Sequence, residues 1–71
     1  MEHSKHIEIN STICTGKPVI KGTRLTVDFI LEILSLGWSY EQICEEYKIS
    51  REDILAVLAY AHSIVEDEKI Y

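Results

Sequence analysis

The chain has 71 residues, 46% of them hydrophobic, and a formal net charge of −5. This length allows one domain of marginal stability, and no apolar run approaches the ~20 residues of a membrane span, so a membrane protein is excluded and oligomerisation is expected. Residues 1–26 contain four Lys or Arg and two acidic residues, a net charge of +2. Residues 27–71 contain three Lys or Arg and ten acidic residues, a net charge of −7. Only the N-terminal part can therefore attract a nucleic acid.

Short strands are expected before residue 27. Residues 6–10 alternate polar and apolar side chains, which indicates a strand, and residues 18–27 contain a second strand and a third, with a bend at Lys21 and Gly22. His3 and His6 are interpreted as tail residues. A lone two-stranded hairpin is marginal in water, so these strands are expected to pair across a dimer or to cover one end of the helices.

A basic segment spans residues 13–27, with the sequence ICTGKPVIKGTRLTV. It contains the only proline and two of the three glycines, a composition that favours fixed turns. Four of its residues are predicted to contact phosphate: Lys17, Lys21, Thr23 and Arg24. The alternative is that Arg24 pairs with Asp28 or Glu32 and fixes the loop onto the following helix. The TGKP sequence lacks the ending of a nucleotide-binding P-loop.

Three helices are expected from residue 27 onwards, and each begins after a hydroxyl side chain. The predicted N-terminal caps are Thr26, Ser39 and Ser50. Gln42 completes a capping box after Ser39, and Asp53 stands at the same distance after Ser50. Gly37 is expected to end the first helix in a left-handed conformation. These signals predict a single domain over residues 1–71, with strands and basic loops over 7–26, a three-helix unit over 27–66 and a frayed tail over 67–71.

The faces of the three helices differ in polarity. The first is apolar on most sides, so a second subunit is expected to help cover it. The outward residues of the second are Glu41, Glu45 and Glu46, interpreted either as a solvated face or as a docking surface for a basic partner. The face of the third helix that is predicted to pack in the core consists of Ile54, Val57, Leu58, Ala61, Ile64 and Val65. Its predicted outer face is small and flat, with Glu52, Ala56, Ala59 and Ser63.

Residues 39–61 resemble the helix-turn-helix pattern of many bacterial regulators. Cys44 is small enough for the next helix to cross closely, and Ile49 fills the corner. Lys48 stands where the pattern usually has glycine, which predicts either a left-handed residue at a cost of about 1 kcal/mol or a turn of another shape. Arg51 is the predicted DNA contact of the last helix, but Glu52 and Asp53 share its first turn and repel phosphate. Taken alone, this unit is more typical of a structural core than of a base-reading device.

The two cysteines, Cys14 and Cys44, are thirty residues apart, without a CxxC motif or a histidine at ligand spacing. This pattern predicts no metal site. Because the sequence shows no secretory hydrophobic segment, we expect a cytoplasmic protein with two free thiols, a disulfide being the alternative.

With these motifs together, the chain resembles the small prokaryotic family called domain of unknown function 433. The family hallmark is CGGKP-x-I-x-GTR, followed by G-x-(S/T)-x-E-x-I and L-x-x-E-D-I. Residues 7 to about 62 carry the resemblance, with Thr15 where the family usually has glycine. The resemblance implies a mainly α, homeodomain-like tri-helical helix-turn-helix fold with short N-terminal strands, commonly dimeric.

Some members of this family are similar to antitoxins encoded beside ribonuclease-like toxins. The leading hypothesis is therefore an antitoxin-like homodimer that binds a cognate toxin and operator DNA, without catalysis or a cofactor. The acidic face of the second helix is expected to hold the toxin. The alternative is a non-catalytic protein-protein interaction module that does not bind DNA.

Overall fold

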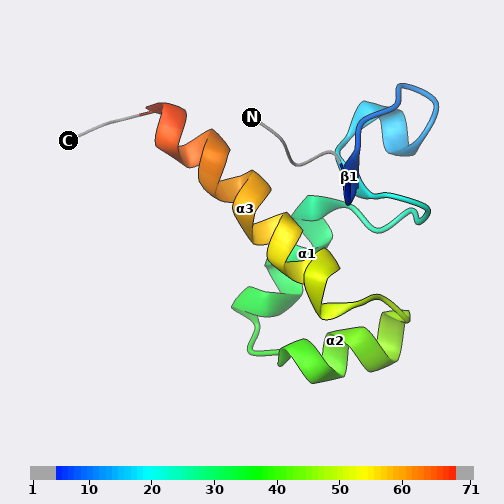
Figure 1. Cartoon of the computed structure of the whole chain (residues 1–71), viewed down its shortest axis with the longest axis vertical. Helices are drawn as coiled ribbons and strands as arrows, with labels where there is room; N and C mark the ends of the chain where they lie inside the picture. The colour runs from blue at the N-terminus through cyan, green and yellow to red at the C-terminus, as the bar shows by residue number, and fades with distance from the viewer. Residues whose placement is uncertain (1–4, 69–71) are drawn as a thin grey trace.

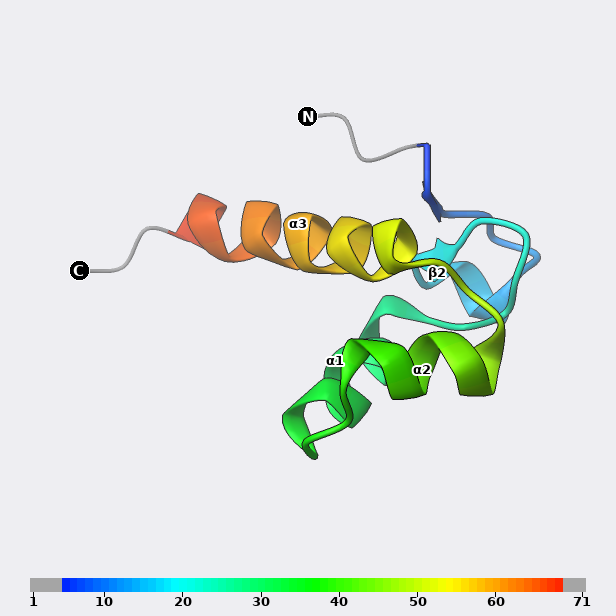
Figure 2. The same ribbon diagram turned by 60° about the horizontal axis from the view of Figure 1, so that its bottom comes forward.

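The computed structural model describes residues 5–68, and in this range two short strands precede three helices (Figure 1). The elements are β1 (Ile7–Glu8), the 3-10 turn η1 (Cys14–Gly16), β2 (Val19–Ile20), α1 (Val27–Ser35), α2 (Tyr40–Tyr47) and α3 (Arg51–Glu68). The predicted fold class, mainly α with a short N-terminal hairpin, is confirmed. In Figure 2, α3 lies above α1 and α2 as a separate layer.

The hairpin is shorter than the sequence predicts. β1 and β2 run antiparallel, with Ile7 opposite Ile20 and Glu8 opposite Val19. The expected third strand is reduced to a single bridge between Val19 and Thr26. Val19 and Ile20 have exposed fractions of only 0% and 1%. Burial against the helices therefore holds this hairpin in place, since two-residue strands form too few ladder bonds to do so.

All three predicted helix caps are confirmed. The Thr26 hydroxyl accepts a hydrogen bond from the Phe29 N–H at 3.0 Å. Ser39 and Gln42 form a reciprocal capping box, with distances of 3.1 and 2.8 Å. Each cap satisfies N–H groups that the first turn of a helix leaves without a partner.

Residues with left-handed backbone angles stand at the C-terminal ends of α1 and α2. Gly37, with φ of +101°, follows α1 as predicted. Lys48 ends α2 at φ of 58° and ψ of 43°, so the strained form of the turn is the one that the chain adopts. α3 continues to Glu68, two residues past the predicted end of the three-helix unit. His3 and residues 69–71 of the expected tail lie outside the described residues.

The core among the described residues consists only of isoleucine and valine. Its buried members are Ile7, Val19, Ile20, Val27, Ile30, Ile33, Ile43, Ile49, Ile54 and Val57. These β-branched side chains have restricted rotamers, so the core loses little side-chain entropy on folding. Within residues 5–68, no helix combines the length and the hydropathy needed to cross a bilayer.

The prediction for the second half of α3 is wrong. Ile64 and Val65, expected in the core, have exposed fractions of 48% and 63%. Ala56, expected on the outer face, instead packs against the core together with Tyr60. The reason is length, because the nine residues of α1 span about 14 Å whereas the eighteen residues of α3 span about 27 Å. α1 can therefore cover only part of α3.

Candidate functional site

α2 and α3 form the helix-turn-helix unit that the sequence predicts. The turn over residues 48–50 joins them, and Ile49, only 9% exposed, fills the corner between the helices. Cys44 is half-buried and packs against the core. The first turn of α3, where such units approach a partner, is thus held at a fixed angle to α2.

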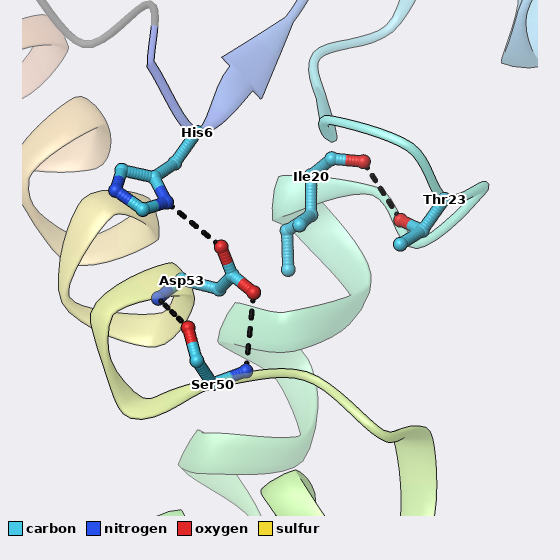
Figure 3. A network of polar contacts seen from close by, with 5 residues as sticks. All are labelled: His6, Ile20, Thr23, Ser50 and Asp53. Atoms are coloured by element: carbon cyan, nitrogen blue, oxygen red, sulfur yellow. Dashed lines mark hydrogen bonds and ion pairs between the residues drawn. The ribbon is translucent and has the colours of Figure 1, made fainter.

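A polar network fastens the hairpin to the first turn of α3 (Figure 3). The His6 Nδ1 atom lies 2.9 Å from Asp53 Oδ1. Asp53 Oδ2 accepts a hydrogen bond from the Ser50 N–H at 3.1 Å, and the Ser50 hydroxyl accepts one from the Asp53 N–H at 3.2 Å. The interpretation of His6 as a tail residue is therefore wrong. Its partner is 47 residues away, and no local pattern in the sequence signals such a contact.

This network changes the charge that α3 presents. Partial burial alone raises the pKa of Asp53, but the hydrogen bonds from Ser50 and His6 and the charge of His6 outweigh it, so the pKa lies below its ordinary value. Asp53 is thus ionised at neutral pH, and its carboxylate points into the network with an exposed fraction of 20%. Both acidic residues of this turn therefore remain negatively charged, Asp53 inside the network and Glu52 exposed on the surface.

The turn after β2 carries cationic residues close to this network. The Lys21 N–H donates to the His6 carbonyl at 2.7 Å, so the turn is tied to the same residue that contacts Asp53. Lys21 and Arg24 are both exposed. Thr23 uses its hydroxyl inside the turn instead, donating to the Ile20 carbonyl at 2.8 Å and accepting from the Leu25 N–H at 3.0 Å. Its part in the site is to hold the turn in shape.

Arg24 does not pair with α1. Within residues 5–68, the ion pair between His6 and Asp53 is the only one, so neither Asp28 nor Glu32 binds the Arg24 guanidinium. Arg24 and Thr23 line a shallow hollow with Glu8. The guanidinium is thus available to an anionic partner.

Lys17 lies apart from the other predicted phosphate contacts. It lines a second, apolar groove beside α1 and α3, together with Pro18. The basic cluster predicted from the sequence is therefore divided between two places on the molecule, because Val19 and Ile20 lie buried between Lys17 and Lys21.

Arg51 supplies the cation of α3. Its guanidinium carbon lies 4.8 Å from the centroid of the Tyr40 ring, a cation–π contact between the first turns of α2 and α3. Arg51 remains exposed. The contact fixes the position of the charge without neutralising it.

The acidic residues of α2 form a separate surface. Glu41, Glu45 and Glu46 are all exposed, whereas Ile43 on the other side of the helix is fully buried. Glu41 and Glu45 are neighbours one turn apart, so their like charges repel each other slightly in the isolated chain. A cationic partner relieves this repulsion.

The two cysteines, which are the remaining reactive side chains, do not form a disulfide. Cys14 and Cys44 are free, half-buried thiols, and the Cys14 thiol donates weakly to the Arg24 carbonyl at 3.5 Å. No group of three or more His, Cys, Asp or Glu gathers at metal-binding distance in the described part of the chain. The described surfaces include exposed charges of both signs and an apolar groove.

Comparison with known proteins gives one match. A family model described as protein of unknown function (DUF433) matches residues 7–61. No curated protein and no solved structure matches the chain significantly. The matched residues include both strands, α1, α2 and the first half of α3. The chain therefore belongs to the DUF433 family of proteins of unknown function.

Proposed function

We propose that this protein is an antitoxin-like, dimeric helix-turn-helix protein of the cytoplasm, which binds operator DNA and a cognate ribonuclease-like toxin. One observation carries the proposal. The contact between His6 and Asp53, together with the bond from the Lys21 N–H to the His6 carbonyl, ties the turn that carries Lys21 and Arg24 to the first turn of α3, which begins at Arg51. The segment that carries two of the cations is thus linked to the end of α3 from which helix-turn-helix proteins approach DNA.

The number of these cations sets the expected salt dependence. Three exposed cations in each subunit give six phosphate contacts in a dimer, so the logarithm of the binding constant should fall with the logarithm of salt concentration at a slope of about −5. Glu52 and the glutamates of α2 are exposed nearby in the sequence. We therefore expect weak binding that is measurable only at low salt.

The toxin is proposed to bind the acidic surface of α2. A ribonuclease binds the phosphates of its substrate through basic residues. Glu41, Glu45 and Glu46 present three negative charges that complement such a surface and would cover it.

A mobility-shift assay on DNA from upstream of the gene tests the DNA part. A shift is expected at about 50 mM salt, where phosphate contacts are strongest, and its absence there would reject DNA binding. The double variant Lys21→Ala/Arg24→Ala should reduce the slope to about −2, because four of the six contacts are lost. Lys17→Ala removes the same charge beside the other groove and, once sedimentation equilibrium shows that the variant is still a dimer, should leave the slope unchanged.

Co-expression with the product of a neighbouring reading frame tests the toxin part. The two proteins should copurify, and the triple variant Glu41→Lys/Glu45→Lys/Glu46→Lys should abolish the complex. Glu32→Lys, an exposed acidic residue of α1, is the control and should retain it. Copurification of the wild type that survives the triple variant would contradict the assignment of this surface.

The second candidate function is an interaction module that does not bind DNA. The net charge of −5 and the exposed glutamates of α2 favour it. It predicts a stable protein complex together with no shift of DNA at any salt concentration, an outcome that separates it from the first.

A further inference from the structure

An apolar groove of about 390 Å³ lies between the start of α1 and the second half of α3. The apolar residues that line it are Pro18, Val27, Leu31, Ala61, Ile64 and Val65. Ile64 and Val65 are 48% and 63% exposed, although the sequence pattern places them on the same face as the core. The groove is therefore the place where the core face of the domain reaches solvent.

The apolar stripe of α3 extends beyond the part that the other described elements cover. In the first half of α3, Ile54 and Val57 have exposed fractions of 0%. The same stripe continues one and two turns later through Ala61 and Ile64, at the helical spacing of three to four residues. Figure 1 shows the last turns of α3 projecting away from the other elements. A helix with this stripe is expected to be covered by a further helix.

We infer that this groove is the homodimer interface, in which the α3 helices of two copies cross antiparallel about a two-fold axis near Ile64. The inference rests on the proposed function, in which the protein acts as a dimer. A two-fold interface brings the same patch of both copies together. The patch suits this symmetry, because it holds both a hollow, with Leu31, and apolar side chains that can fill a hollow, Ile64 and Val65.

The charges around the groove also fit a second copy. Lys17 lies on its rim, and Asp28 lines it as well. Glu66 and Asp67, both exposed, do not line the groove, so its lining holds one charge of each sign. A patch with both signs can pair with its own copy, whereas a patch of one sign repels it. The acidic surface of α2 lacks this property, so it fits a basic partner and the groove fits a copy of the chain.

Two glutamate substitutions on α3 test the inference. Ile64→Glu places a charge in the groove, and Leu55→Glu does so at a residue of the same helix with a similar exposed fraction, 45%, outside the groove. The mass of the full chain is measured by sedimentation equilibrium at micromolar concentration, and circular dichroism reports folding. We expect dimers for the wild type and for Leu55→Glu. The dissociation constant of Ile64→Glu should rise about a hundredfold or more, because each dimer would bury two unpaired carboxylates.

The outcomes separate this inference from the proposed function. A wild-type dimer that Ile64→Glu leaves intact would place the interface elsewhere and overturn the inference, while the dimeric function would stand. A monomeric wild type would overturn both. A monomeric wild type that loses a copurified toxin on Ile64→Glu would assign the groove to the toxin. If Ile64→Glu unfolds the chain, Val65→Glu, at a more exposed position, decides by the same criteria.

Discussion

Asp53 links three parts of the molecule through one carboxylate. It caps the backbone of Ser50, contacts His6 of the hairpin, and is a negative charge at the N-terminus of α3, where the helix dipole favours one. The hydrogen bonds are made to the ionised form, which is why its pKa is lowered despite partial burial. A single titration therefore governs the first turn of α3.

The lowered pKa of Asp53 predicts a loss of stability in acid. Because the unfolded chain takes up this proton first as pH falls, the contribution is complete above the unfolded pKa of about 3.9 and is lost as pH falls through the lower folded value. Asp53→Asn should remove this component, so its free energy of unfolding should fall less steeply below pH 4 in urea titrations. Glu52→Gln, an exposed neighbour, should keep the wild-type slope, and parallel slopes for Asp53→Asn and the wild type would contradict the prediction.

Lys48 is the residue where a substitution should stabilise the fold. Its φ of 58° is a left-handed conformation that costs a side-chain-bearing residue about 1 kcal/mol and costs glycine nothing. Lys48→Gly should therefore raise the free energy of unfolding by up to about 1 kcal/mol, measured by urea titration. Glu46→Gly, at a helical residue in the last turn of α2, is the contrasting control and should lower it, by up to about 1 kcal/mol. A destabilised Lys48→Gly variant would argue for a different turn.

At the scale of elements, the tether between His6 and Asp53 connects the hairpin, and through the Lys21 N–H the turn after β2, to the first turn of α3. His6→Ala should lower the free energy of unfolding by about 1 kcal/mol, because it removes one hydrogen bond to a charged group. It should also weaken the DNA shift although no cation is removed, since the turn with Lys21 and Arg24 loses its link to α3. His62→Ala, an exposed histidine of α3, is the control for stability. An unchanged shift for His6→Ala would mean that the tether does not position the cations.

The elements also show which features a sequence reveals. Helix starts depend on residues three positions apart, so the caps at Thr26, Ser39 and Ser50 were predictable. The tether joins residues 47 positions apart and has no such signature. The periodicity of α3 predicted the buried residues Ile54 and Val57, although it placed Ala56 on the wrong face, and whether Ile64 is covered depends on the length of another helix. Local rules thus predict the elements, and the candidate site depends on how those elements meet.

At the scale of the whole molecule, the charges and the groove occupy different surfaces. The turn with Lys21 and Arg24 is bonded to His6, which contacts the first turn of α3; the acidic glutamates lie on α2, and the groove lies along the second half of α3. In the proposed function, DNA, a basic protein and a second copy would therefore be contacted through different residues of the chain. A dimer joined through the groove places its two cationic turns at opposite ends.

This arrangement predicts the spacing of an operator. Thirteen residues separate Arg51 from Ile64, which is about 20 Å of helix, so two antiparallel α3 helices that cross near Ile64 place their first turns up to about 40 Å apart. If the two helices cross at an inclined angle, this distance becomes shorter and approaches one helical turn of B-DNA, about 34–36 Å, which is the distance between the half-sites of such dimers. Inserting about five base pairs, half a turn, between half-sites found by footprinting should therefore abolish binding by the dimer, whereas a full-turn insertion should weaken it less. Ile64→Glu should bind all three sites alike, because a monomer contacts one half-site at a time. Equal binding of the wild type to all three sites would contradict the crossing of α3 helices that sets the distance.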